Sequence, residues 1–317
     1  MIFNQAENKK IWSIAWPMML CSLTTPLLGL TDTFLLGHVS SGEHLSAVAI
    51  GVSVISMLYW GFGFLRMGTT SLIARDRGQQ LKTGRMAPEI TANILGRGLL
   101  LALFCSVLVL LLTPFSAALI VEAMNASTAI APLSIDYIQV RLYSAPAVLI
   151  SYVISGWLIG SQNTRAALAI VITANVINIG LDYVFIAELN MHSRGAAIAS
   201  VIAEYAAAGL AIGILINAKI LDRDLRWRQW FKLSACKALL QLNYHLFIRT
   251  LLILFSLNFF TAQGAALGDN VLAANAILLQ LALLTAYVMD GFSFAAEALC
   301  GCLLYTSDAA DDTPCVD

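Results

Sequence analysis

Charged residues are scarce in this sequence. Only 12% of its 317 residues are Asp, Glu, Lys or Arg, whereas 59% are hydrophobic. Because soluble domains carry about 25% charged residues, this chain has too little polar surface to cover a soluble globule. We therefore expect an integral membrane protein, with the lipid bilayer as its surroundings. The net charge is −1 and the sequence contains no basic domain or basic arm, so nucleic acid is not an expected partner.

Motifs for metal binding and catalysis are also missing from the sequence. The six cysteines include no CxxC pair, and the four histidines form no HExxH motif. No nucleophile–base arrangement stands out either. We therefore expect neither an enzyme nor a metal site, and no catalytic residues or bound cofactor.

Long apolar runs are what the sequence does contain. A membrane-spanning helix needs about 20 mostly apolar residues, and a helix satisfies its own backbone hydrogen bonds in lipid. The runs that meet this length are 11–36, 45–73, 90–113, 134–159, 166–187, 195–217, 239–263 and 271–299. The predicted fold class is therefore an all-α membrane protein with eight spans.

Basic residues alternate between the connections that join these spans. The N-terminal segment and every second connection after it hold thirteen Lys and Arg residues, whereas the other connections hold only Arg194. Positively charged connections stay in the cytoplasm. We therefore expect a cytoplasmic N-terminus.

The connection 218–238 is interpreted as a linker that divides the chain into two units. It is the most basic connection, and the aromatic residues Trp227, Trp230 and Phe231 among its cations are typical of an amphipathic helix at a membrane surface. The sequences LSAVAI and GFGF of the second span resemble LAANAI and GFSF of the eighth, which indicates a parallel repeat. The expected organisation is six transmembrane helices in 1–217, a cytoplasmic linker in 218–238, and two helices of a second unit in 239–301.

The last residues, 302–317, differ in composition from the rest. The sequence CLLYTSDAADDTPCVD is acidic and contains no Lys or Arg. It resembles a transposase-adapter sequence from DNA library preparation that has been translated in frame. We therefore expect this tail to be non-native, the natural protein to continue past Gly301, and the tail to carry no function.

Asp32 is the only charged residue between Ile11 and Leu36. An ionisable group at membrane depth is costly unless it is paired, so it usually faces a cavity and has a function. Pro17 and Pro26 lie upstream, and a proline inside a helix permits a bend. A bendable helix with one carboxylate could be a moving part; a helix cap is the alternative.

Polar residues also form a stripe on the span 166–187. Asn175, Asn178 and Asp182 are spaced i, i+3 and i+7 and therefore share one helix face. Burial disfavours the charged form of a carboxylate, so Asp182 could take up and release a proton or bind a cation. Polar contacts between helices are the alternative.

Other ionisable residues within the spans could form ion pairs. Asp290 and Glu297 are seven apart on one helix face, and Arg66 and Arg249 are candidate partners. Glu204 stands alone on its span. Arg97 and Arg141 are expected to extend toward a membrane surface.

Five stretches of the chain resemble the multidrug and toxic compound extrusion (MATE) transporters, and among them the DinF branch. These stretches are PLLGLTDTFLLGH, FLRMGTTSLIA, NVINIGLDYVF, GAAIASVIAEYA and AYVMDGFSFAAEA. The resemblance implies a fold of twelve helices in two six-helix lobes around a V-shaped cavity. This chain would hold the N-lobe and the first two helices of the C-lobe. The resemblance also implies a bacterial cytoplasmic (inner) membrane location and a monomeric full-length protein.

The same resemblance implies a transport function. Its members export small organic compounds, often cationic or amphipathic, in exchange for protons or sodium ions. It assigns proton coupling to Asp32 and a helix bend to Pro17. The residues that would complete the coupling site are Asn178, Asp182, Tyr137 and Ser200. Two alternatives remain: a transporter similar to lipid-linked oligosaccharide flippases, and a truncated fragment without function.

Overall fold

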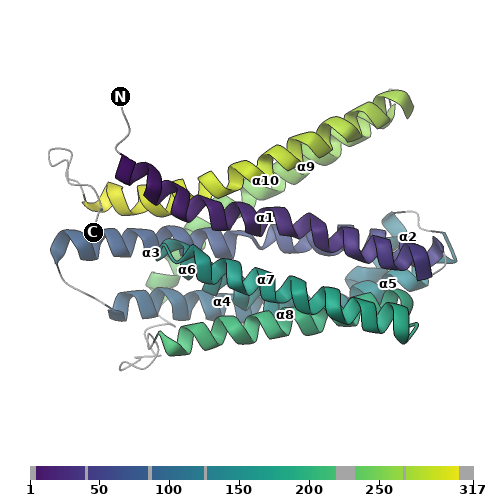
Figure 1. The fold of residues 1–317 in the computed structure, drawn as a ribbon, viewed down its shortest axis with the longest axis horizontal. Helices are drawn as coiled ribbons and strands as arrows, with labels where there is room; N and C mark the ends of the chain where they lie inside the picture. The colour runs from purple at the N-terminus through teal and green to yellow at the C-terminus, as the bar shows by residue number, and fades with distance from the viewer. Residues whose placement is uncertain are drawn as a thin grey trace.

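The computed structural model describes residues 5–39, 42–84, 88–124, 127–218, 233–266 and 269–306. Within these ranges the chain consists of helices joined by short turns, and the described residues include no strand (Figure 1). The helices are α1 (Gln5–Val39), α2 (Gly42–Gly61), α3 (Phe64–Thr83), α4 (Pro88–Ala123), α5 (Ile130–Leu142), α6 (Ala145–Gly160), α7 (Thr164–Asp182), the π-helix η1 (Tyr183–Glu188), α8 (His192–Asn217), α9 (Leu233–Ala266) and α10 (Asp269–Thr306).

These helices confirm the predicted all-α fold, and each expected span coincides with one helix or with two consecutive helices. By length and hydropathy, five helical segments of the described chain can cross a membrane, and the bent pair α5–α6 makes a sixth. The described apolar parts of α1 and α9 are shorter, at Ile11–Thr24 and Tyr244–Leu257. The expected linker lies largely outside the described residues, as does the tail from residue 307 onward.

The span 134–159 is divided into two helices that the hydropathy pattern did not separate. The axes of α5 and α6 differ by 49°, and the break falls at Tyr143 and Ser144. Pro146 in the first turn of α6 has no backbone N–H that could bond the carbonyl oxygen of Leu142, and a proline ring clashes with the carbonyl group four residues before it. The proline therefore explains why the helix breaks here.

Small residues let α6 pack directly on α3. A Cβ atom added at Gly156 would lie 2.6 Å from the carbonyl oxygen of Arg66 and 2.9 Å from Cβ of Thr69. At Gly160 it would lie 2.7 Å from the carbonyl oxygen of Thr70. The backbones of the two helices are thus close, and this contact includes the backbone of Arg66.

Replacing Gly156 by valine should destabilise the protein. The added side chain has to push α6 away from the backbone of α3, and overpacking of this kind costs about 1–3 kcal/mol. We expect a lower midpoint of thermal unfolding in detergent. Gly209→Val is the matched control, because no atom lies within 4 Å of a Cβ at Gly209. Equal midpoints for the two variants would contradict this packing.

The helix α10 contacts the N-terminal bundle along its second half. Gly291 packs on α1, where an added Cβ would lie 2.7 Å from the carbonyl oxygen of Ala15, and Phe292 contacts Trp12 edge to face. Ala295 is buried with Ile14 and Ala15. Upstream, α9 and α10 diverge from α1 (Figure 1), and large apolar side chains such as Leu281 and Leu284 are exposed. We call the end of the bundle where α10 meets α1 and α3 the closed end.

Candidate functional site

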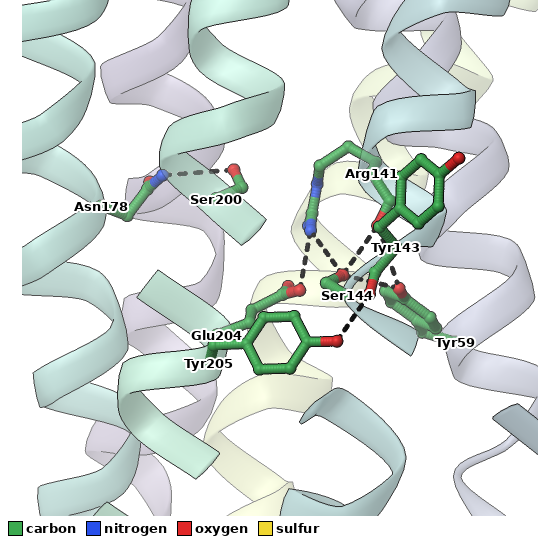
Figure 2. Close-up of polar contacts among 8 residues, drawn as sticks. All are labelled: Tyr59, Arg141, Tyr143, Ser144, Asn178, Ser200, Glu204 and Tyr205. Carbon is green, nitrogen blue, oxygen red and sulfur yellow. Dashed lines mark hydrogen bonds and ion pairs between the residues drawn. The ribbon is translucent and has the colours of Figure 1, made fainter. Parts of the chain in front are cut away.

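Three neighbouring helices each place two polar side chains, one turn apart, inside the N-terminal bundle. Residues four apart lie on the same face of a helix, and α5, α7 and α8 pack on one another in the pairs α5–α8 and α7–α8. Figure 2 shows four of these residues and their neighbours. The six residues, which we call the polar cluster, are Tyr137 and Arg141 of α5, Asn178 and Asp182 of α7, and Ser200 and Glu204 of α8.

One contact within the cluster joins α7 to α8. The amide nitrogen Nδ2 of Asn178 donates a hydrogen bond to Oγ of Ser200 over 3.2 Å, and both residues are buried. The resemblance to MATE transporters had placed these two residues in one site, and the structure brings them together. The oxygen Oδ1 of Asn178 and the nitrogen Nδ2 of Asn175 are buried and make no hydrogen bond to the described residues. The oxygen calls for a hydrogen-bond donor or a cation and the amide nitrogen for an acceptor, and a water molecule could serve either atom.

Asp182 lies where α7 changes its helical geometry. It is fully buried, and the next six residues form the π-helix η1. Short π-helical segments are rare and occur frequently at functional sites. The sequence carried no signal for this segment, because its residues, YVFIAE, form no pattern that distinguishes a π-helix from an α-helix.

The second contact within the cluster is an ion pair. The guanidinium of Arg141 lies 2.8 Å from Oε2 of Glu204, with side-chain exposures of 10% and 22%. The expectation that Arg141 extends toward a membrane surface is therefore wrong, because the side chain is buried and turns to α8. Glu204, which stood alone in the sequence, has its partner on α5. Figure 2 shows this ion pair and the Asn178–Ser200 bond in the same part of the bundle.

Hydroxyl groups surround the ion pair at the break between α5 and α6. Arg141 also donates to Oγ of Ser144 at 3.2 Å, and this hydroxyl donates to the carbonyl oxygen of Arg141 at 2.7 Å. The hydroxyl of Tyr59 lies 2.8 Å from Oγ of Ser144 (Figure 2). Tyr205 donates to the carbonyl oxygen of Tyr143 over 3.0 Å. The polar atoms at the break are thus hydrogen-bonded to side chains from α2 and α8.

Tyr137 is buried one turn before Arg141, and its ring packs against Gly51 of α2. Pro17 is buried within α1, which continues as one helix through both of its prolines and packs along α7. Asp32 belongs to the same helix. The side chains of Asp32 and Pro26 lie outside the described part of the structure.

The residues proposed for ion pairs at α10 make other contacts. Glu297 is bonded to Ser71 of α3, whose Oγ lies 2.7 Å from Oε1. The guanidinium carbon of Arg66 lies 4.7 Å from the ring centroid of Phe294 and 5.9 Å from that of Tyr152. Such cation–π contacts offset part of the cost of burying a cation. The side chains of two further candidates, Arg249 and Asp290, are exposed. The described residues include no group of three or more His, Cys, Asp and Glu that could hold a metal ion.

Known proteins match both the sequence and the fold. The MatE family matches residues 17–184. DNA damage-inducible protein F of Escherichia coli (strain K12) is 37% identical over 309 residues, which are 95% of this chain and 64% of that protein. The multidrug resistance protein MdtK of Photorhabdus laumondii subsp. laumondii is 26% identical over 181 residues, 57% of this chain and 38% of that protein.

The solved structures include an outward-facing conformation of a multidrug resistance MATE family transporter of the MOP superfamily. It superposes with a TM-score of 0.82 at 23% identity and covers 94% of this chain and 65% of that chain. At this level of identity the likeness concerns the fold. The chain spans less than two thirds of the length of each of these relatives.

Proposed function

This chain belongs to the MatE family of multi-pass membrane transporters, and from that premise we propose that it exports organic compounds in exchange for protons. The expected substrates are cationic or amphipathic, and the expected location is the inner membrane of a bacterium with the N-terminus in the cytoplasm. The names of its relatives, which include a multidrug resistance protein, support the substrate class.

The observation that carries the proposal is the polar cluster inside the bundle. A membrane-spanning helix rarely buries a carboxylate without a function, and Asp182 is fully buried. An ionised carboxylate only accepts hydrogen bonds, whereas a protonated one also donates. The buried Oδ1 of Asn178, one helical turn from Asp182, is an acceptor that a protonated carboxylic acid could use. Proton uptake would therefore change the hydrogen bonding between α7 and its neighbours.

The helix α1 would convert this change into movement. It packs along α7, it carries Asp32, and it contains the buried Pro17 half-way along its apolar part. Proline removes one backbone hydrogen bond, so a bend at this position costs less than elsewhere in the helix. In our proposal, protonation of Asp32 and Asp182 bends α1 at Pro17 and releases the exported compound. Sodium ions bind the same kind of oxygen ligands and are the alternative coupling ion.

The proposal is tested with the chain reconstituted in lipid vesicles. Uptake of ethidium, a fluorescent organic cation, is followed while a proton gradient or a sodium gradient is imposed across the membrane. We expect uptake driven by the proton gradient, with a proton counterflow, and no uptake without a gradient. Uptake driven only by the sodium gradient would show that sodium, and not the proton, is the coupling ion. Indifference to both gradients would contradict antiport and favour the flippase-like alternative.

A further inference from the structure

The closed end of the bundle contains a carboxylate that the proposed coupling site does not include. Glu297 lies on α10, and its bonding partner Ser71 lies on α3, 226 residues away in the sequence. The contacts of Gly291 with α1 and of Phe294 with Arg66 lie on the same half of α10. Any separation of α10 from the N-terminal bundle at this end therefore breaks the Ser71–Glu297 bond.

The single hydroxyl of Ser71 faces two acceptors, and protonation of Glu297 would turn one of them into a donor. Oγ of Ser71 lies 2.7 Å from Oε1 of Glu297 and 3.0 Å from the carbonyl oxygen of Met67. A hydroxyl has a single proton to donate, so with an ionised Glu297 both acceptors share that proton. A protonated Glu297 donates to Ser71, which then donates to Met67, and both hydrogen bonds are complete. Proton binding thus completes the contact between α3 and α10.

The charged groups around Glu297 could stabilise its ionised form, which is the alternative to the protonated form. Arg66 of α3 and Arg249 of α9 both attract its negative charge, although neither forms a direct ion pair with it among the described residues. Arg66 also acts on Asp290, which lies two turns earlier on α10. Among the described residues, the charge of Arg66 also acts on Cys21 of α1 and Tyr152 of α6. Once the contact with Ser71 opens, water and these two arginines can stabilise an ionised Glu297.

We propose that Glu297 is a second proton-binding residue, which carries a proton while the closed end is shut and releases it when α10 separates from α3. This inference rests on the proposed proton-coupled function and adds a second coupling residue. Linkage between binding and conformation is reciprocal. If closure favours the proton, a higher proton concentration must favour closure. On the orientation expected from the basic connections, the closed end faces the cytoplasm, so the proton would leave on that side.

Distance measurements between spin labels test this linkage. The labels are placed at Ser46 of α2 and Ala274 of α10, two exposed positions near the beginnings of these helices. Labels attached to genetically encoded ketone amino acids leave the native cysteines intact. In the otherwise unchanged chain in vesicles, the label-to-label distance of the present structure, in which α10 contacts α3, marks the shut state. We expect the population at this distance to grow as the pH falls.

Four variants separate a proton-binding role from a packing role. Glu297→Gln keeps a donor for Ser71 and should show the acidic distance distribution at every pH. Glu297→Ala loses the contact and should show the open distribution at every pH. Ser71→Ala removes the acceptor and should shift the midpoint of the transition to lower pH. Glu89→Gln changes an exposed glutamate of α4 and should behave as the unchanged chain.

Two results would overturn the inference: distances that do not respond to pH in the unchanged chain, or a pH response that survives in Glu297→Gln. Neither depends on ethidium transport. A pH-linked closure that Glu297→Gln abolishes, in a protein that shows no proton-driven uptake, would refute the proposed function and leave the role of Glu297 intact. Proton-driven uptake together with an unaltered pH response in Glu297→Gln would support the proposed function and refute the role of Glu297.

Discussion

Asp32→Asn should reduce proton-driven ethidium transport to the level of empty vesicles while the amount of protein in the membrane stays normal. Asparagine has almost the same size as aspartate, but its side-chain amide does not bind or release a proton as a carboxylate does. A polar residue remains in the helix, so insertion into the membrane is not expected to suffer. The measurement is uptake in vesicles under an imposed proton gradient, normalised to the protein content of each preparation.

Two further variants define what a loss of transport means. Asp182→Asn, at the buried end of α7, should show the same loss if the two carboxylates act together. Glu43→Gln is the matched control, because Glu43 is exposed at the beginning of α2. Full transport by Asp32→Asn would refute its role in coupling, whatever the outcome for Asp182.

Arg141→Leu should strongly destabilise the fold. Removing one partner of a buried ion pair leaves the other charge uncompensated, which costs about 3–5 kcal/mol. Because Glu204 keeps 22% of its side-chain exposure, we expect a loss of about 3 kcal/mol, the lower end of that range. The substitution also removes the donor to Ser144 at the break between α5 and α6. The midpoint of thermal unfolding in detergent measures the effect.

The matched control for Arg141 is a second arginine that is paired at the surface. Arg194 lies 3.9 Å from Asp136, and the side chains are 64% and 44% exposed. Exposed ion pairs contribute about 0–1 kcal/mol, so Arg194→Leu should have little effect on the midpoint. In the double variant Arg141→Leu, Glu204→Leu, no buried charge is left alone, and much of the lost stability should return. Equal effects of Arg141→Leu and Arg194→Leu would contradict a buried pair.

Hydropathy alone was sufficient to find the helices, of which five segments and the bent pair α5–α6 are long and apolar enough to cross a membrane in the described chain. Each predicted apolar stretch lies on one helix or on two consecutive helices of the structure, since a chain in lipid has to satisfy its backbone within each segment. The break between α5 and α6 had a visible cause in Pro146, but a hydropathy window averages over such a residue. The π-helix after Asp182 had no cause that a sequence pattern could reveal.

What the sequence by itself determined about this protein is therefore its class, its helices and the faces on which polar residues recur. The spacing of Asn178 and Asp182 placed them on one side of α7, because helical periodicity is a local property. Only the tertiary structure decided the partners. Arg141 meets Glu204 across 63 residues and Ser71 meets Glu297 across 226. Such pairs depend on how each helix is rotated and packed, and one sequence contains no direct record of those angles.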